Sequence, residues 1–311
     1  MKTLLRLIRI ENLLLLAGMQ LLVRYGFLKP QGIDLALNNF QFACLVLSTV
    51  LIAAAGYIIN DVYDQDTDAV NKPKRRIIGT KLSETAAYNY YVGFNIVGVG
   101  LGFYLSQVIL RPSFAVLFIL VAALLFLYAS QWKGMLIVGN LVVALTLAIS
   151  VWIIGIFDIF PATYSENQKA MALVFSILND YALLALMVNF LREMVKDLQD
   201  VPGDQAAGIR TLPVVWGISK STRLVAVLHL IPVVLVFWYI NTYLMEFDLL
   251  GITVYLLLFV VAPLIFTAIS IWNASTPQQF RLVSNVLKAV IVMGIISLWI
   301  LHYNIQYNAA R

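Results

Sequence analysis

Two short acidic segments of the sequence share one pattern, in which an aspartate is followed by others three and seven residues later. The members are Asp61, Asp64 and Asp68 in the first segment and Asp197, Asp200 and Asp204 in the second. On a helix this spacing places three carboxylates on one face, where they repel each other unless they share a cation. Mg²⁺ prefers oxygen ligands and often bridges phosphate oxygens. The two segments together therefore predict a divalent-metal site that can hold a diphosphate.

The two segments differ in their local context. Asn60 precedes the first segment and could add an amide oxygen to the metal site. Pro202 and Gly203 interrupt the second segment, so we expect its helix to end near Val201 and Asp204 to come from a loop. Either segment alone could be a solvated acidic loop. Their repetition, each after a long apolar run, favours metal binding.

Basic residues accompany both acidic segments. They are Lys72, Lys74, Arg75 and Arg76 after the first segment, and Arg192, Lys196 and Arg210 around the second. Both kinds of cation suit phosphate oxygens. The group at 72–76 could instead serve only to orient the protein in a membrane. Arg192 and Lys196 lie nearer the apolar run, where charges are costly and are more often functional.

A third polar segment, residues 128–133, joins two apolar runs. Lys133 is its only basic residue, which makes this lysine a candidate ligand for a diphosphate. Tyr128 and Trp132 flank it, and aromatic residues are also common at membrane interfaces. The segment therefore has two readings, a substrate contact or an interfacial anchor.

The composition is that of a membrane protein. The chain has 311 residues, of which 61% are hydrophobic and 12% are charged, whereas soluble domains average about 25% charged residues. Its apolar runs are long enough to cross a bilayer as helices. We therefore predict an all-α, polytopic transmembrane bundle that forms one integral-membrane domain over residues 1–311. The nine predicted spans are 4–26, 40–60, 84–107, 112–130, 136–157, 171–195, 221–243, 249–272 and 283–303.

The basic residues predict the orientation. With this topology, sixteen of the 21 lysines and arginines lie on the side of the N-terminus. The positive-inside rule then places the N-terminus and both acidic segments in the cytoplasm, across the inner or plasma membrane if the source is bacterial. The net charge of +5 suits contact with anionic membrane lipid. No aromatic-basic module for nucleic acid is evident in the sequence, so no nucleic-acid partner is expected.

The sequence resembles the UbiA family of membrane prenyltransferases. Residues 60–68 read NDVYDQDTD, which fits that family's N-D-x-x-D-x-x-x-D motif at every fixed position. Three further segments resemble family motifs, and they are residues 71–75, residues 128–140 and residues 200–213. Arg76 departs from the family pattern at a place where proline is common.

The resemblance implies a Mg²⁺-dependent transfer of a prenyl group from an isoprenyl diphosphate to a lipophilic acceptor, with release of diphosphate. The implied metal ligands are Asp61, Asp64, Asp68, Asp200 and Asp204. The implied substrate-binding residues are Asn60, Arg75, Tyr128, Lys133, Arg192 and Lys196. Asp64, Asp197 and Asp200 would be catalytic, and Asp197 could be either a metal ligand or a base.

The acceptor is less well defined. Residues 192–204 look most like the branch that includes geranylgeranylglycerol-phosphate geranylgeranyltransferases and chlorophyll synthases, which suggests prenylglycerol phosphate. An aromatic quinone precursor or a tetrapyrrole precursor would react by the same mechanism. A cation-coupled transporter is the alternative from another class. Transporters tend to place ionisable groups near the bilayer midplane, whereas these aspartates follow the ends of apolar runs.

Overall fold

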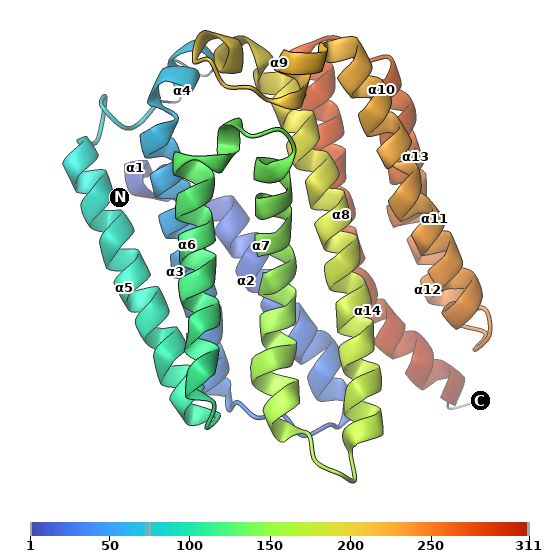
Figure 1. The fold of residues 1–311 in the computed structure, drawn as a ribbon. Helices are drawn as coiled ribbons and strands as arrows, with labels where there is room; N and C mark the ends of the chain where they lie inside the picture. The colour runs from blue at the N-terminus through green and yellow to red at the C-terminus, as the bar shows by residue number, and fades with distance from the viewer. Residues whose placement is uncertain (1, 72, 74–75, 310–311) are drawn as a thin grey trace.

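The computed structural model describes residues 2–71, 73 and 76–309. Within that part of the chain the structure is helical and has no strand, only an isolated bridge between Ile78 and Leu82. Nine of the described helical segments are long and apolar enough to cross a membrane. They stand side by side as one bundle (Figure 1). The prediction of an all-α bundle with nine spans is confirmed.

The helical segments include short turns of π and 3-10 helix that continue several spans. The elements are α1 (Lys2–Leu7), α2 (Ile10–Leu21), η1 (Leu22–Leu28), η2 (Lys29–Gln31), α3 (Asn39–Tyr63), α4 (Gln65–Asn71), α5 (Glu84–Val108), η4 (Pro112–Phe114), α6 (Ala115–Ser130), η5 (Trp132–Gly134), α7 (Val138–Ile154), η6 (Gly155–Ile159), η7 (Phe160–Ala162), α8 (Gln168–Ala206), α9 (Leu212–Trp216), α10 (Ile218–Leu228), α11 (Leu230–Tyr239), η8 (Ile240–Leu244), α12 (Leu250–Leu256), η9 (Leu257–Val261), α13 (Ala262–Trp272) and α14 (Pro277–Ala309).

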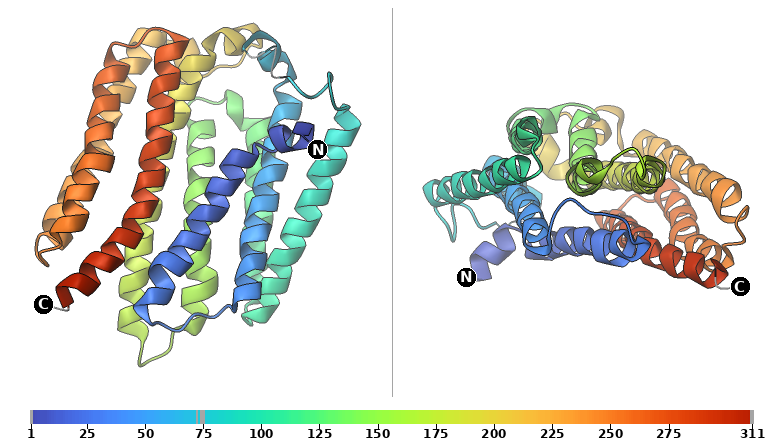
Figure 2. Two further views of the ribbon diagram at one scale, coloured as in Figure 1. Left: turned by 180° about the vertical axis from the view of Figure 1, so that it is seen from behind. Right: turned by 90° about the horizontal axis from the view of Figure 1, so that it is seen from below.

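Consecutive spans pack against each other, and further contacts join spans that are not consecutive in the chain. α3 packs against α5 and α6, α7 packs against α8, and α8 also packs along α14 from the far end of the chain. Small and hydroxyl residues let α3 and α5 approach closely. At this contact the buried Ser48 hydroxyl donates to the Gly98 carbonyl at 2.6 Å. α4 and α9 lie at one end of the bundle, and the N-terminus lies toward that same end (Figures 1 and 2).

The first span begins later than the sequence predicts, at Ile10 rather than at residue 4. α1 ends at Leu7, and Arg9 has a left-handed backbone with φ 51°, so the chain turns before α2 begins. Such a conformation is uncommon for a residue other than glycine. The Arg9 side chain binds Asp61 and lies over the Tyr57 ring, and these contacts help to hold the left-handed backbone in place.

The predicted end of α8 near Val201 is wrong. The helix continues to Ala206 with Pro202 inside it, so Asp204 lies on the helix and not in a loop. Proline removes only one helical N–H in this last turn. Asn71 adds tertiary support there, because its side chain donates to the Asp200 carbonyl and accepts from the Gly203 N–H, both at 2.9 Å.

A buried ion pair lies at the end of the bundle that is opposite α4 and α9. Arg24 and Asp158 have side-chain exposures of 2% and 0%, and Arg24 Nε lies 3.4 Å from Asp158 Oδ2. Arg24 also donates to the Leu37 carbonyl, while the Leu37 N–H donates to Asp158 Oδ1 at 2.9 Å. These bonds join η1, η6 and the segment before α3. Arg24 is therefore a buried structural residue rather than a loop cation that reports orientation.

Candidate active site

A cavity of about 1120 Å³ lies among α2, α3, α6, α7, α8 and α14. Its lining is acidic at the end of the bundle that carries α4, where Asp61, Asp64 and Asp68 meet Asp197 and Asp200. Farther along the same helices the lining becomes apolar. The space therefore offers a polar site for a charged group and an apolar site for a hydrocarbon chain.

The first acidic segment occupies a break between two helices. α3 ends at Tyr63, Asp64 has φ −88° and ψ 8°, and α4 begins at Gln65. Asn60 Nδ2 donates to Asp64 Oδ2 at 2.6 Å, and the Lys133 ammonium forms an ion pair with Asp64 Oδ1. The bond from Asn60 fixes the Asp64 carboxylate, because Asn60 comes from the preceding helical turn.

Arg9 is a site residue that our reading of the sequence missed. Its guanidinium donates to Asp61 Oδ1 at 2.8 Å and lines the same cavity. Asp61 and Asp64 are thus each balanced by a cation from another part of the chain. The available signal was a basic residue near the start of the first predicted span, where a charge is costly.

Lys133 enters the site from η5, the short turn between α6 and α7, and its side chain is 25% exposed. Burial by itself would lower the pKa of Lys133, but nearby carboxylates outweigh burial and hold that pKa above its ordinary value. These carboxylates belong to Asp64, Asp204 and Asp200. Lys133 therefore remains a cation at neutral pH, next to aspartates of both acidic segments.

The second acidic segment does not contribute uniformly to the cavity. Asp197 lines it and accepts a hydrogen bond from Asn140 Nδ2 at 2.8 Å, while Asp200 lines it one turn later. Asp204 is only 4% exposed and is not among the residues that line the cavity. Its Oδ2 accepts from the Thr211 hydroxyl at 3.2 Å. Asp204 therefore supports the cavity wall and acts on Lys133 through its charge.

The remaining candidate residues divide into three groups. Tyr128, Arg192 and Lys196 line the cavity. Arg75 lies outside the described residues, as do Lys72 and Lys74. Arg76 is used structurally, because it donates to the Ile78 carbonyl at 3.2 Å and to Gln65 Oε1 at 3.3 Å.

The donor chemistry of the acidic end fits Mg²⁺. Five aspartate carboxylates of the two acidic segments line one cavity, and oxygen-only donors are typical of magnesium rather than of zinc. Within the described residues, no three His, Cys, Asp or Glu side chains are close enough together to hold a metal ion. Arg9 and Lys133 hold Asp61 and Asp64 in this arrangement. These carboxylates would have to come closer together to share an ion.

Fold and site define an integral-membrane protein with a cavity that is acidic at one end and largely apolar farther along. The model of the UbiA prenyltransferase family matches residues 21–289. The chain belongs to this family and is a UbiA-type membrane prenyltransferase.

Comparison with individual proteins agrees with the family assignment. A digeranylgeranylglyceryl phosphate synthase from Saccharolobus solfataricus is 31% identical over 298 residues, which cover 96% of this chain and 95% of that protein. A UbiA homologue from Aeropyrum pernix shares the fold with a TM-score of 0.66 and 17% identity, over 95% of this chain and 97% of that one. A homologue from Archaeoglobus fulgidus, bound to DMAPP and Mg²⁺, has a TM-score of 0.58 and 15% identity, over 95% and 99% of the two chains.

Proposed function

We propose that this enzyme transfers a prenyl group from an isoprenyl diphosphate to the hydroxyl of a prenylglycerol phosphate and releases diphosphate. One observation carries the proposal: two acidic segments and Lys133 meet at the polar end of a cavity of about 1120 Å³ that also has a long apolar part. The Saccharolobus solfataricus relative, a digeranylgeranylglyceryl phosphate synthase that matches nearly the whole chain, supports this acceptor. The Archaeoglobus fulgidus homologue, bound to DMAPP and Mg²⁺, supports the donor and the metal.

The aspartates at the polar end would hold the diphosphate through Mg²⁺. When bound, Mg²⁺ supplies positive charge that stabilises the departing diphosphate. Its ligands would come from the four carboxylates Asp61, Asp64, Asp68 and Asp200. Asp204 is not a direct ligand in this proposal, because it faces Thr211 behind the cavity wall.

Lys133 would bind a diphosphate oxygen directly. It now pairs with Asp64, and a phosphate oxygen can accept the same ammonium protons. Arg9 forms an ion pair with Asp61 and adds positive charge to the polar end of the cavity. Cations that are already in place when the leaving group gains charge stabilise the transition state without further reorganisation.

Asp197 would act as the base in this proposal. In the reaction the C1–O bond of the prenyl diphosphate breaks and its electron pair leaves with the diphosphate. The acceptor hydroxyl forms a new bond to C1 and gives up its proton. Asn140 holds the Asp197 carboxylate at the cavity wall, three residues before Asp200, where it could accept this proton.

The prenyl chain would occupy the apolar part of the cavity. That part is lined by side chains such as Leu22, Val23, Phe118 and Leu298. An apolar lining binds the hydrocarbon and keeps water away from an electron-deficient C1. The reaction would take place at the cytoplasmic side if the positive-inside rule holds for this protein.

The proposal is tested with purified protein, several allylic diphosphates and a panel of acceptors. The panel contains prenylglycerol phosphate, an aromatic quinone precursor and a tetrapyrrole. We expect a prenylated glycerol phosphate by mass spectrometry and equimolar diphosphate, both lost when EDTA removes Mg²⁺. Transfer to another acceptor alone would replace the proposed substrate. Movement of a cation without any diphosphate release would support the transporter alternative.

A further inference from the structure

A second group of cations lines the cavity, apart from the Lys133–Asp64 ion pair. It consists of Arg192 and Lys196 on α8 and Lys288 on α14, two helices that pack against each other. Arg192 precedes Asp200 by two helical turns, or roughly 12 Å along the axis at 1.5 Å per residue. Arg192 therefore lies at a different level of the cavity from Asp200, and Lys196 lies between these two levels, one turn before Asp200.

These cations are only partly neutralised. Glu193 accepts from Arg192 Nη1 at 3.1 Å and from Lys196 Nζ at 2.7 and 3.0 Å. One carboxylate is thus shared by two cations, and Glu193 is itself buried. Arg9, which also lines the cavity, is already bound to Asp61.

Lys288 has a neutral partner. Its ammonium donates to Asn12 Oδ1 at 2.7 Å, and the described residues supply no carboxylate within ion-pair distance of it. Glu11, next to Asn12 in the sequence, is exposed and acts on Lys288 through its charge without forming an ion pair. A lysine within a membrane span is costly unless it has a role.

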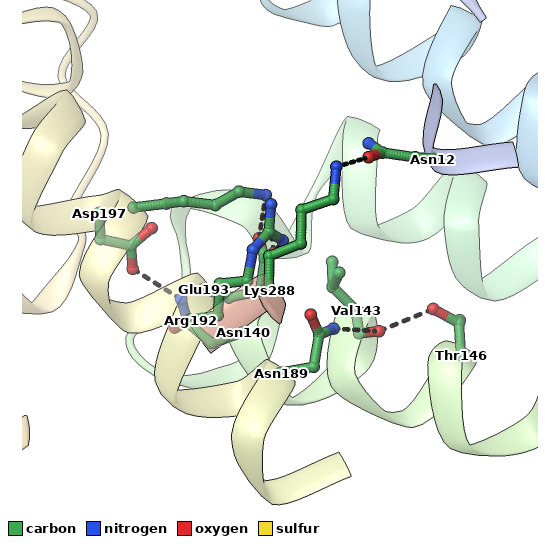
Figure 3. A network of polar contacts seen from close by, with 10 residues as sticks. Asn12, Asn140, Val143, Thr146, Asn189, Arg192, Glu193, Asp197 and Lys288 are labelled. Atoms are coloured by element: carbon green, nitrogen blue, oxygen red, sulfur yellow. Dashed lines mark hydrogen bonds and ion pairs between the residues drawn. The ribbon is translucent and has the colours of Figure 1, made fainter. Parts of the chain in front are cut away.

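Arg192 has a donor to spare. Its Nε is buried and, among the described residues, has no hydrogen-bond partner. A buried donor without a partner is unfavourable and is uncommon in folded proteins. In Figure 3 the side chains of Arg192 and Lys288 lie next to each other, and their charges are close enough to repel. Two cations held together in this way favour an anion between them.

We propose that Arg192, Lys196 and Lys288 bind the phosphate monoester of the lipid acceptor. This inference rests on the proposed function, and it separates the two phosphate-bearing substrates. Lys133 and the aspartates hold the diphosphate, whereas the second group holds the acceptor with its hydroxyl between the two sites. An arginine fork and two lysine point charges, from two helices, suit the several oxygens of a phosphate monoester.

Lys288→Gln tests the charge with little change of shape, since the glutamine amide can still donate to Asn12. Kinetics are measured in phosphatidylcholine nanodiscs with prenylglycerol phosphate and with uncharged prenylglycerol. We expect wild type to prefer the phosphorylated acceptor at least tenfold in kcat/KM. Lys288→Gln should lose most of this preference through a higher acceptor KM, and the KM for isoprenyl diphosphate should stay within twofold.

Two control variants separate charge from structure. Lys288→Arg should restore most of the preference. Arg281→Gln removes an exposed cation from the same helix, outside the cavity lining, and should leave the preference unchanged. Equal use of the two acceptors by wild type, or equal loss on both in Lys288→Gln, would overturn the assignment. A rise confined to the diphosphate KM would overturn it as well.

Direct binding separates this inference from the proposed reaction. Labelled prenylglycerol phosphate is bound without Mg²⁺ and without diphosphate, in competition with phosphatidylglycerol. Binding that Lys288→Gln weakens tenfold supports the site even if no prenyl group is transferred, in which case only the proposed reaction fails. Equal displacement by phosphatidylglycerol would identify a general lipid-headgroup site instead. That result, or no binding by wild type, overturns the acceptor assignment.

Discussion

Asn71 and Gly203 meet where the two acidic segments join, and their contact leaves no space for a side chain at position 203. The Asn71 amide accepts from the Gly203 N–H and donates to the Asp200 carbonyl, both at 2.9 Å. A Cβ atom at Gly203 would lie 2.3 Å from Asn71 Nδ2. This contact fixes α4 against the last turns of α8. It therefore sets the position of Asp68 relative to Asp200.

Gly203→Ala should disturb the site without unfolding the bundle. The new methyl group must displace the Asn71 side chain, and both of its hydrogen bonds would then be lost. We expect kcat/KM for the isoprenyl diphosphate to fall at least roughly tenfold, about 1.4 kcal/mol, with a higher Mg²⁺ requirement. A Mg²⁺ titration of the initial rate measures both effects. Gly100→Ala is the control, because the space around a Cβ there is open.

Asp64→Ala and Asp200→Ala should each abolish transfer while the protein still inserts. Removing a carboxylate from a site that is shared between metal and diphosphate should cost several kcal/mol of transition-state stabilisation, at least roughly 100-fold in rate. Product formation is measured by mass spectrometry and folding by size-exclusion profile. Asp66→Ala, an exposed neighbour outside the cavity lining, should retain activity. Near wild-type turnover of either site variant at saturating Mg²⁺ would contradict the proposed metal site.

Lys133→Gln should weaken use of the isoprenyl diphosphate and spare the acceptor. The charge-assisted bond to a phosphate oxygen would be lost from a partly dry site, so kcat/KM should fall at least roughly tenfold, about 1.4 kcal/mol. The acceptor KM should change much less, which is the reverse of the pattern for Lys288→Gln. Lys220→Gln removes an exposed cation and serves as control. Unaltered diphosphate kinetics would assign Lys133 to membrane anchoring.

Asp158→Ala should destabilise the protein far from the cavity. It leaves Arg24 buried without its carboxylate and removes the acceptor of the Leu37 N–H. Breaking one side of a buried pair costs about 3–5 kcal/mol in soluble proteins. Thermal unfolding in detergent should show a clear fall in Tm, with near-normal activity of the folded fraction. The double variant Arg24→Met with Asp158→Leu should recover part of the loss. An unchanged Tm would show that the pair is not structural.

The orientation is tested by single-cysteine labelling in a Cys44→Ser background. Lys81 and Glu166 are both exposed, in the connections that follow α4 and η7, at opposite ends of the bundle. We expect Lys81→Cys to react from the cytoplasm and Glu166→Cys from the other side, because basic residues favour the cytoplasmic face. Transfer activity of each variant confirms insertion. Labelling of both positions from one side would contradict the predicted topology.

The number and extent of the spans could be predicted because each depends on a local property. An apolar run of sufficient length must become a helix in lipid, where its backbone groups have no water to bind. The span predicted at 112–130 coincides with the observed one, and the span predicted at 84–107 differs by one residue. The two acidic segments were equally visible, since their spacing is a property of a few consecutive residues.

Local rules failed where a distant residue changes the balance. Pro202 predicted the end of α8, but the helix continues past it to Ala206, where Asn71 from α4 binds the Gly203 N–H. The sequence showed Asp204 as one more carboxylate of its segment, whereas packing turned it towards Thr211. The Asn71 contact leaves no trace in the sequence around Pro202, because Asn71 comes from a separate element.

The sequence by itself determined that this protein is a nine-span helical membrane protein with two aspartate segments, since apolar length and residue spacing are local. Only the tertiary structure decided which side chains complete the site. Arg9 reaches Asp61 from before the first span, and Lys288 reaches the cavity from the last span. Such pairings join residues that are far apart in the chain. They arise from the packing of α2, α3, α8 and α14 around one cavity, and helix packing depends on all of these surfaces at once.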